Sequence, residues 1–390
     1  MIAHNPDFQH FPRWLLMLLV FFLIDCLPYS VTAQKSSGSE QPVIEIAFCL
    51  DLSGSTNGLI DNFRESIWSV INHVELYKPA QQLRIGVVGF SRPSFGKNSA
   101  YVKVLSNLTT NFDRMVADLW KLKPEVEKGD QFVSNALTMT GSGLNWSKSP
   151  KTIRIIFLIG NGNVDTGSGD YRTAVNELKE DGFILIPVYC LQSRKSKEIA
   201  GWQQIGIISG TTFESIYVDR RIPLAPPIEE QGVLQYLVLQ LDKQLVPYTT
   251  EGQVQFSRTV TCDNKILTVP AALENRMNYR ISDSFLTQTK RWDLVAADIK
   301  NPNDLLNYDT AFLNDSLKKL NTTQLFENIQ QKRINRDNTL IKIKKLLPQI
   351  RQEYFNELVS RQEFETEFIL EKVILKSISD VCSKRGIVVK

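Results

Sequence analysis

A short apolar run that ends in a polar motif constrains the fold of this chain more than any other feature. The run covers residues 44–50 and leads into Asp51, Ser53 and Ser55, with Gly54 between the two serines. A buried helix needs a longer apolar segment, and glycine breaks helical structure, so the pattern favours a buried strand. The three polar side chains then lie on the loop that leaves the strand. One carboxylate and two hydroxyl oxygens at one point suit Mg²⁺, which prefers oxygen ligands.

The apolar pattern repeats along the next 170 or so residues, with helical patterns between the apolar segments. Buried strands that alternate with helices indicate an α/β fold with a doubly wound, mainly parallel sheet covered on both faces. Ligands of such sheets bind beyond the carboxyl ends of the strands. Asn161 follows the most apolar later strand, so it faces the Asp51 loop if the two strands are neighbours. The predicted strands are 44–50, 83–90, 101–105 (an edge strand), 153–159, 183–190 and 211–218, and the predicted helices are 58–74, 112–122, 133–144, 171–180, 196–205 and 232–245.

The N-terminus is typical of a signal peptide. Arg13 precedes an apolar run over residues 14–24, and Val31-Thr32-Ala33 is a small-residue cleavage pattern. We therefore predict a signal peptide over residues 1–33, a linker over residues 34–42, and no membrane-spanning segment after cleavage. The mature chain is expected to be exported, to a bacterial periplasm, a cell surface or the medium.

The second half predicts a separate domain over residues 247–390, after a first domain over residues 43–246. Alternating residues from 254 to 262 and from 266 to 269 predict a β hairpin with a turn at Asp263-Asn264. Three helical patterns follow, at residues 313–320, 340–354 and 364–382, with Pro348 kinking or starting the second. We expect these helices to pack together in a small bundle.

The composition excludes several classes of protein. A net charge of +3 and no basic stripe with interleaved aromatics argue against a nucleic-acid partner. After signal cleavage His73 is the one histidine left, so Ser-His-Asp, Cys-His and histidine-zinc mechanisms are disfavoured. Cys49 and Cys190 fall in predicted core strands, whereas Cys262 and Cys382 could pair in an exported chain. We expect a binding protein, not an enzyme.

Residues 42–246 resemble a von Willebrand factor A-type domain. The resemblance rests on three segments, residues 48–55, 84–91 and 155–162, in the order that the family shows. It implies a metal-ion-dependent adhesion site, whose first motif matches Asp51, Ser53 and Ser55. The threonine of the family's second loop falls at Gln131, with Asp130 beside it, and the later aspartate falls at Asn161.

These departures remove negative charge that would offset desolvation of a cation, although Asp130 or Asp165 could restore some. The resemblance implies Mg²⁺ (or Mn²⁺ or Ca²⁺) held by Asp51, Ser53 and Ser55, with Gln131, Asp130 and Asn161 as further partners. A carboxylate of a protein ligand would complete the metal shell. The alternative is a metal-independent scaffold of the cell envelope, in which Asp51 and the serines bond only to the loop itself. A hydrolase is the least favoured interpretation, because no general base accompanies Asp51.

Overall fold

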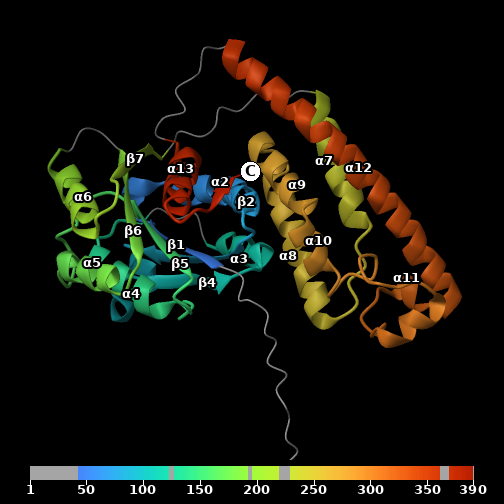
Figure 1. Ribbon diagram of the computed structural model, residues 1–390. Coiled ribbons are helices and arrows are strands. Elements are labelled where there is room, and N and C mark those ends of the chain that lie inside the picture. Colours follow the sequence, from blue (N-terminus) through green and yellow to red (C-terminus); the bar gives the residue numbers. More distant parts are fainter. Residues whose placement is uncertain (1–42, 123–126, 192–195, 219–228, 361–368, 390) are drawn as a thin grey trace, which may run out of the picture. The chain divides into compact units, whose positions relative to one another are not determined.

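The computed structural model describes residues 43–122, 127–191, 196–218, 229–360 and 369–389 (Figure 1). The predicted signal peptide and the linker lie outside these residues.

A six-stranded sheet forms the centre, in the order β4-β3-β1-β5-β6-β7. β4 runs antiparallel to β3 at one edge, and the other neighbouring strands pair in parallel. The predicted doubly wound, mainly parallel sheet is therefore confirmed. β1 lies between β3 and β5, so the loops after β1 and β5 leave the same edge of the sheet. The strands are β1 (Val43–Asp51), β3 (Gln82–Phe90), β4 (Lys103–Thr109), β5 (Ile153–Gly160), β6 (Ile184–Leu191) and β7 (Glu214–Tyr217).

The two faces of the sheet bury two separate sets of apolar side chains, because successive residues of a strand point to opposite faces. In β1, Phe48 and Leu50 join one cluster, whereas Ala47 and Cys49 join the other. The second cluster is covered by α4 (Val133–Gly143), α5 (Tyr171–Glu180) and α6 (Ser196–Ser209). The first is covered by α2 (Leu59–Glu75), α3 (Phe112–Leu119), α7 (Glu229–Lys243) and helices of the second half (Figure 1).

The predicted β hairpin is wrong, since residues 250–266 form helix α8 (Thr250–Ile266). Thr249 caps this helix by accepting a hydrogen bond from the Gly252 N–H at 2.8 Å. The buried positions of α8 follow helical spacing, but three of them, Gln255, Thr259 and Asp263, are polar or charged. Because these residues are not apolar, the sequence does not show the helical spacing of the buried face. Its alternating apolar residues indicate a strand instead.

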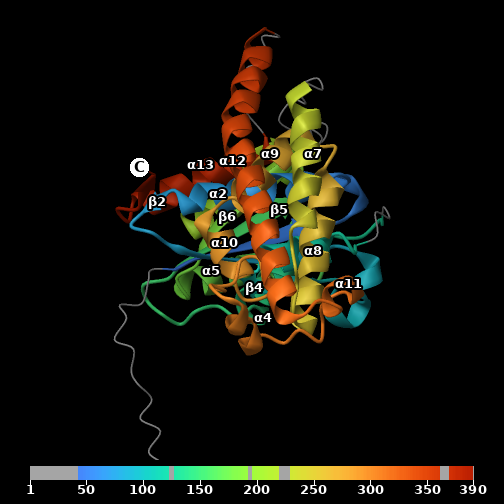
Figure 2. The same cartoon turned by 90° about the vertical axis from the view of Figure 1, so that its right-hand side faces the viewer.

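The helices of the second half pack mostly on the first half and do not form a bundle of their own. α8 contacts α3, and α9 (Pro270–Arg280) contacts α2. α13 (Leu370–Ser383) also contacts α2. α12 (Thr322–Ser360) continues through Pro348 and lies beside α7 (Figures 1 and 2). Gln41–Lys390 thus form one compact unit, and the predicted domain limit at residue 246 stays a prediction.

The remaining elements of the described chain are short. β2 (Tyr77–Lys78) pairs with β8 (Val388–Val389) near the C-terminal end. No described helix is long and apolar enough to cross a membrane. The further elements are η1 (Gly54–Thr56), η2 (Pro93–Phe95), η3 (Lys97–Ser99), α10 (Asp283–Thr289), η4 (Pro302–Asn307) and α11 (Asp315–Lys318).

All four cysteines of the described chain are free and buried. Cys49 and Cys190 lie in β1 and β6, as predicted, and burial raises the pKa of both thiols. Cys262 of α8 and Cys382 of α13 are both free, so the disulfide considered from the sequence is not formed.

Candidate functional site

Asp51 is the last residue of β1 and is fully buried. Its Oδ1 accepts a hydrogen bond from the Ser53 N–H at 2.9 Å, and its Oδ2 accepts one from the Asn161 N–H at 3.3 Å. Burial raises the pKa of Asp51 from 3.8 to about 6, against hydrogen bonds from Ser53, Asn161 and Gln131 that lower it. The carboxylate therefore carries a charge that its surroundings stabilise only in part at neutral pH.

Ser53, Ser55 and Asn161 bring three oxygens together beside Asp51. The Ser53 and Ser55 hydroxyls are 2.9 Å apart, and the Ser55 hydroxyl donates to Asn161 Oδ1 at 2.7 Å. Asn161 Nδ2 also donates to the Ser55 carbonyl at 3.2 Å. The pairing of β1 with β5 thus places both loops over one edge of the sheet, as expected from the sequence.

Of the two neighbouring residues considered for the second loop, the structure brings Gln131 and not Asp130 into the site. Gln131 is buried, and its side chain forms a hydrogen bond with Asp51. Asp130 is exposed. Asp165 is also exposed and pairs with Arg172 at 2.9 Å, so it does not restore charge to the site. Asp51 is the one carboxylate among the oxygen donors described here.

Two glycines let the loops approach so closely. A Cβ on Gly160 would lie 2.6 Å from Asp51 Cβ. Gly162 has a φ of +83°, and a Cβ there would lie 2.7 Å from Gln131 Cγ. Any side chain at Gly162 would therefore strain the backbone and displace Gln131.

Several residues that sequence reasoning missed hold this arrangement. Ser91, fully buried with a φ of +62°, directs its hydroxyl to Gln131 Oε1 and accepts from the Phe132 N–H, both at 3.4 Å. The Thr56 hydroxyl donates to the carbonyls of Asp51 at 2.7 Å and Ser53 at 3.0 Å. Ser91 directly follows β3, the other neighbour of β1, and this position was the signal that could have identified it.

The donor set fits a divalent cation that prefers oxygen ligands. Ligands about 2.0–2.1 Å from an octahedral Mg²⁺ lie about 2.9 Å from their neighbours. The spacings of 2.9 Å between Ser53 and Ser55 and 2.7 Å between Ser55 and Asn161 match that requirement. The charge fits less well, since no cluster of three or more His, Cys, Asp or Glu able to hold a metal occurs among the described residues.

Part of the chain matches a known protein family. Residues 45–214 match the model of the von Willebrand factor type A domain. This part of the chain is a von Willebrand factor type A (vWA) domain. The match ends before α7 and leaves the second half unassigned. No curated protein sequence matches the chain.

Solved structures with a similar fold share little sequence with this chain. Proximal thread matrix protein 1 from the mussel byssus is 17% identical, with 42% of this chain and 40% of that chain covered and a TM-score of 0.32. A second structure of it, described as having a zinc-occupied MIDAS motif, gives 18% identity, coverages of 45% and 44% and a TM-score of 0.33. The pilus adhesin SpaC from Lactobacillus rhamnosus GG is 13% identical, with 46% of this chain and 29% of that chain covered and a TM-score of 0.35. The chain thus spans less than half the length of each of these proteins.

Proposed function

We propose that this protein is an exported binding protein whose vWA domain captures a protein ligand with the help of a divalent cation. The observation that carries the proposal is the convergence of Asp51, Ser53, Ser55 and Asn161 oxygens at the carboxyl ends of β1 and β5. No general base accompanies them in the described site, so we propose binding and not turnover.

Within this proposal each residue has a separate task. Ser53, Ser55 and Asn161 would hold the cation through neutral oxygens, and Asp51 would supply the negative charge. Gln131 and Ser91 keep the second loop against Asp51. When bound, the cation supplies a Lewis-acidic position for a carboxylate of the partner. A site with one carboxylate leaves much of the cation's charge uncompensated, which favours an acidic ligand.

Calorimetric titration of Mg²⁺ and Mn²⁺ into the whole chain tests the metal part of this proposal. Wild type should release or absorb heat with saturation at one site, and Asp51→Asn should weaken binding at least tenfold, because it removes the one negative charge. Asp130→Asn is the matched control, since it removes an exposed carboxylate from the residue that precedes Gln131. Equal binding by wild type and Asp51→Asn would contradict the proposal.

The ligand part needs a separate measurement. Saturation-transfer NMR can compare the peptides acetyl-Gly-Glu-Gly-amide and acetyl-Gly-Gln-Gly-amide with Mg²⁺ or with excess EDTA. We expect transfer to the glutamate peptide alone, and only with Mg²⁺. Equal transfer to both peptides would contradict capture of a carboxylate.

One observation favours a second candidate, a metal-independent interaction protein. Asp51 accepts two backbone N–H groups, and the serine and asparagine oxygens bond to one another. A site satisfied in this way keeps its shape without an ion. Absence of any metal heat, with a stable fold, would select this function.

A further inference from the structure

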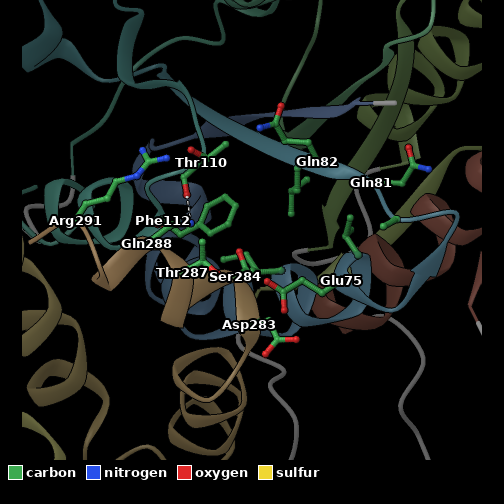
Figure 3. Close-up of a pocket in the computed structure, with 14 residues that line it drawn as sticks. Glu75, Gln81, Gln82, Thr110, Phe112, Asp283, Ser284, Thr287, Gln288 and Arg291 are labelled. Atoms are coloured by element: carbon green, nitrogen blue, oxygen red, sulfur yellow. Dashed lines mark hydrogen bonds between the residues drawn. The ribbon is translucent and has the colours of Figure 1, made fainter. Parts of the chain in front are cut away.

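A groove on the sheet face opposite α4–α6 has no part in the site described above. It has a volume of about 800 Å³ and lies between the end of α2, the start of β3 and helix α10 of the second half (Figure 3). Its apolar lining includes Ile71, Val74, Leu83 and Phe112, all buried. Pockets of this size that combine an apolar floor with a few polar groups are typical ligand sites.

The polar groups at one side of the groove are hydrogen-bond acceptors. Glu75 and Asp283 present carboxylates there, whereas the side chain of Gln81 lies apart from them and Arg291 lies at the other end (Figure 3). The two carboxylates accept hydrogen bonds and, when ionised, cannot donate one.

The charge at this side is also uncompensated. Burial, with the nearby charge of Asp283, raises the pKa of Glu75, against hydrogen bonds from Ser284 and Ser282 that lower it. The Ser282 hydroxyl lies 3.5 Å from Glu75 Oε1. Within the described part of the chain no cationic side chain contributes to the pKa of Glu75 or pairs with Asp283. Lys290, which follows α10, pairs instead with Asp298 at 3.5 Å.

We infer that this groove binds an alkylammonium group carried on an apolar body. An ammonium offers three N–H donors and one positive charge, which complement the two carboxylates. The methylene stem and body of such a ligand cover the apolar floor. The positive charge of Arg291 at the far end directs the ammonium toward Glu75 and away from itself.

Titration of 4-phenylbutylamine into the whole chain, followed by calorimetry, tests this inference. The neutral 4-phenylbutanol and the anionic 4-phenylbutyrate have the same apolar body. We expect the amine to bind at least fivefold tighter than either. Failure of the amine to bind at millimolar concentration, or affinities for amine and alcohol within a factor of two, would overturn the inference.

Variants locate the site. Glu75→Gln and Asp283→Asn should each weaken amine binding at least fivefold. Asp283 is exposed, so its substitution does not endanger the fold if Glu75→Gln proves unstable. Asp298→Asn removes a carboxylate that is 78% exposed and outside the groove, and should leave amine binding unchanged. Unchanged binding by both Glu75→Gln and Asp283→Asn would overturn the assignment.

A second pair of probes separates the two sources of such a group. Acetyl-Leu-Lys-Leu-amide carries it as a lysine of a polypeptide, and acetyl-Leu-Gln-Leu-amide is its neutral control. Tighter binding of the lysine peptide than of 4-phenylbutylamine would assign the groove to a partner's lysine, whereas the reverse order would assign it to a small amine. These measurements need no divalent cation, so their outcome is independent of Asp51.

Discussion

At the scale of single residues, Asp51 combines burial with incomplete stabilisation of its charge. Its pKa of about 6 lies above the usual 3.8, because burial disfavours the ionised form. This group therefore contributes stability that is fully present below pH 3.8 and is lost as the pH rises through 6. A bound cation would stabilise the ionised form, so the cation and the proton compete for the same carboxylate.

This competition predicts a pH dependence of metal binding. Mn²⁺ should raise the melting temperature of wild type at pH 7.5, where Asp51 is ionised, and should have little effect at pH 5. Differential scanning fluorimetry over this range measures the change, with its midpoint expected near pH 6. A stabilisation by Mn²⁺ that is equal at both pH values would contradict the role of Asp51.

A second prediction at this scale concerns Gly162. Gly162→Ala should destabilise the fold by about 1–3 kcal/mol, because it combines a strained backbone with a contact on Gln131. Gly96→Ala is the matched control, since Gly96 also has a positive φ, of +89°, but open space around its Cβ. Chemical denaturation measures both. If the two variants lose equal stability, the packing on Gln131 is unimportant.

At the scale of elements, a buried ionic network joins the helices of the two halves. Arg276 of α9 donates to Asp113 of α3 at 2.5 Å and to Asp263 of α8 at 2.6 Å. Arg280, also of α9, pairs with Asp242 of α7 at 3.0 Å and with Asp263. These side chains are almost fully inaccessible to solvent, so each charge depends on its partners.

Removing one partner should therefore cost much more than removing an exposed pair. Arg276→Met is expected to lower the free energy of unfolding by about 3–5 kcal/mol, since it leaves Asp113 without a cation and Asp263 with Arg280 alone. Arg172→Met is the control, because Arg172 is 49% exposed and pairs at 2.9 Å with Asp165, which is 54% exposed. That change should cost at most about 1 kcal/mol. Urea denaturation measures the free energy of unfolding of both variants. Similar losses in the two would contradict the dependence of the buried charges on their partners.

At the scale of the whole molecule, the vWA domain and the second half share one hydrophobic core. The cluster that contains Phe48 and Leu50 of β1 also contains Cys262 of α8, Met277 of α9 and Ile378 of α13. Ser69 of α2 donates to Glu371 of α13 at 2.5 Å. The outer face of α2 is thus buried by helices more than 200 residues away.

This shared core predicts that residues 43–246 alone are unstable. Without α8, α9 and α13 the fragment exposes apolar side chains of α2 and α3 to water, at a cost of about 25 cal/mol per Å². We expect it to be insoluble or to melt well below the whole chain, by circular dichroism. An equally stable fragment would show that the second half contributes nothing to the fold of the first.

The sequence by itself determined the central sheet and the first half of the site. The strands are apolar runs with local boundaries, and Asp51, Ser53 and Ser55 follow one strand directly, so short-range patterns sufficed. Tertiary structure decided the rest. It made α8 a helix, because buried polar residues such as Thr259 find partners on α3, and it placed Gln131 instead of Asp130 beside Asp51. It also built the groove at Glu75 from segments about 200 residues apart. Such pairings depend on which surfaces meet, and no local pattern of residues specifies that.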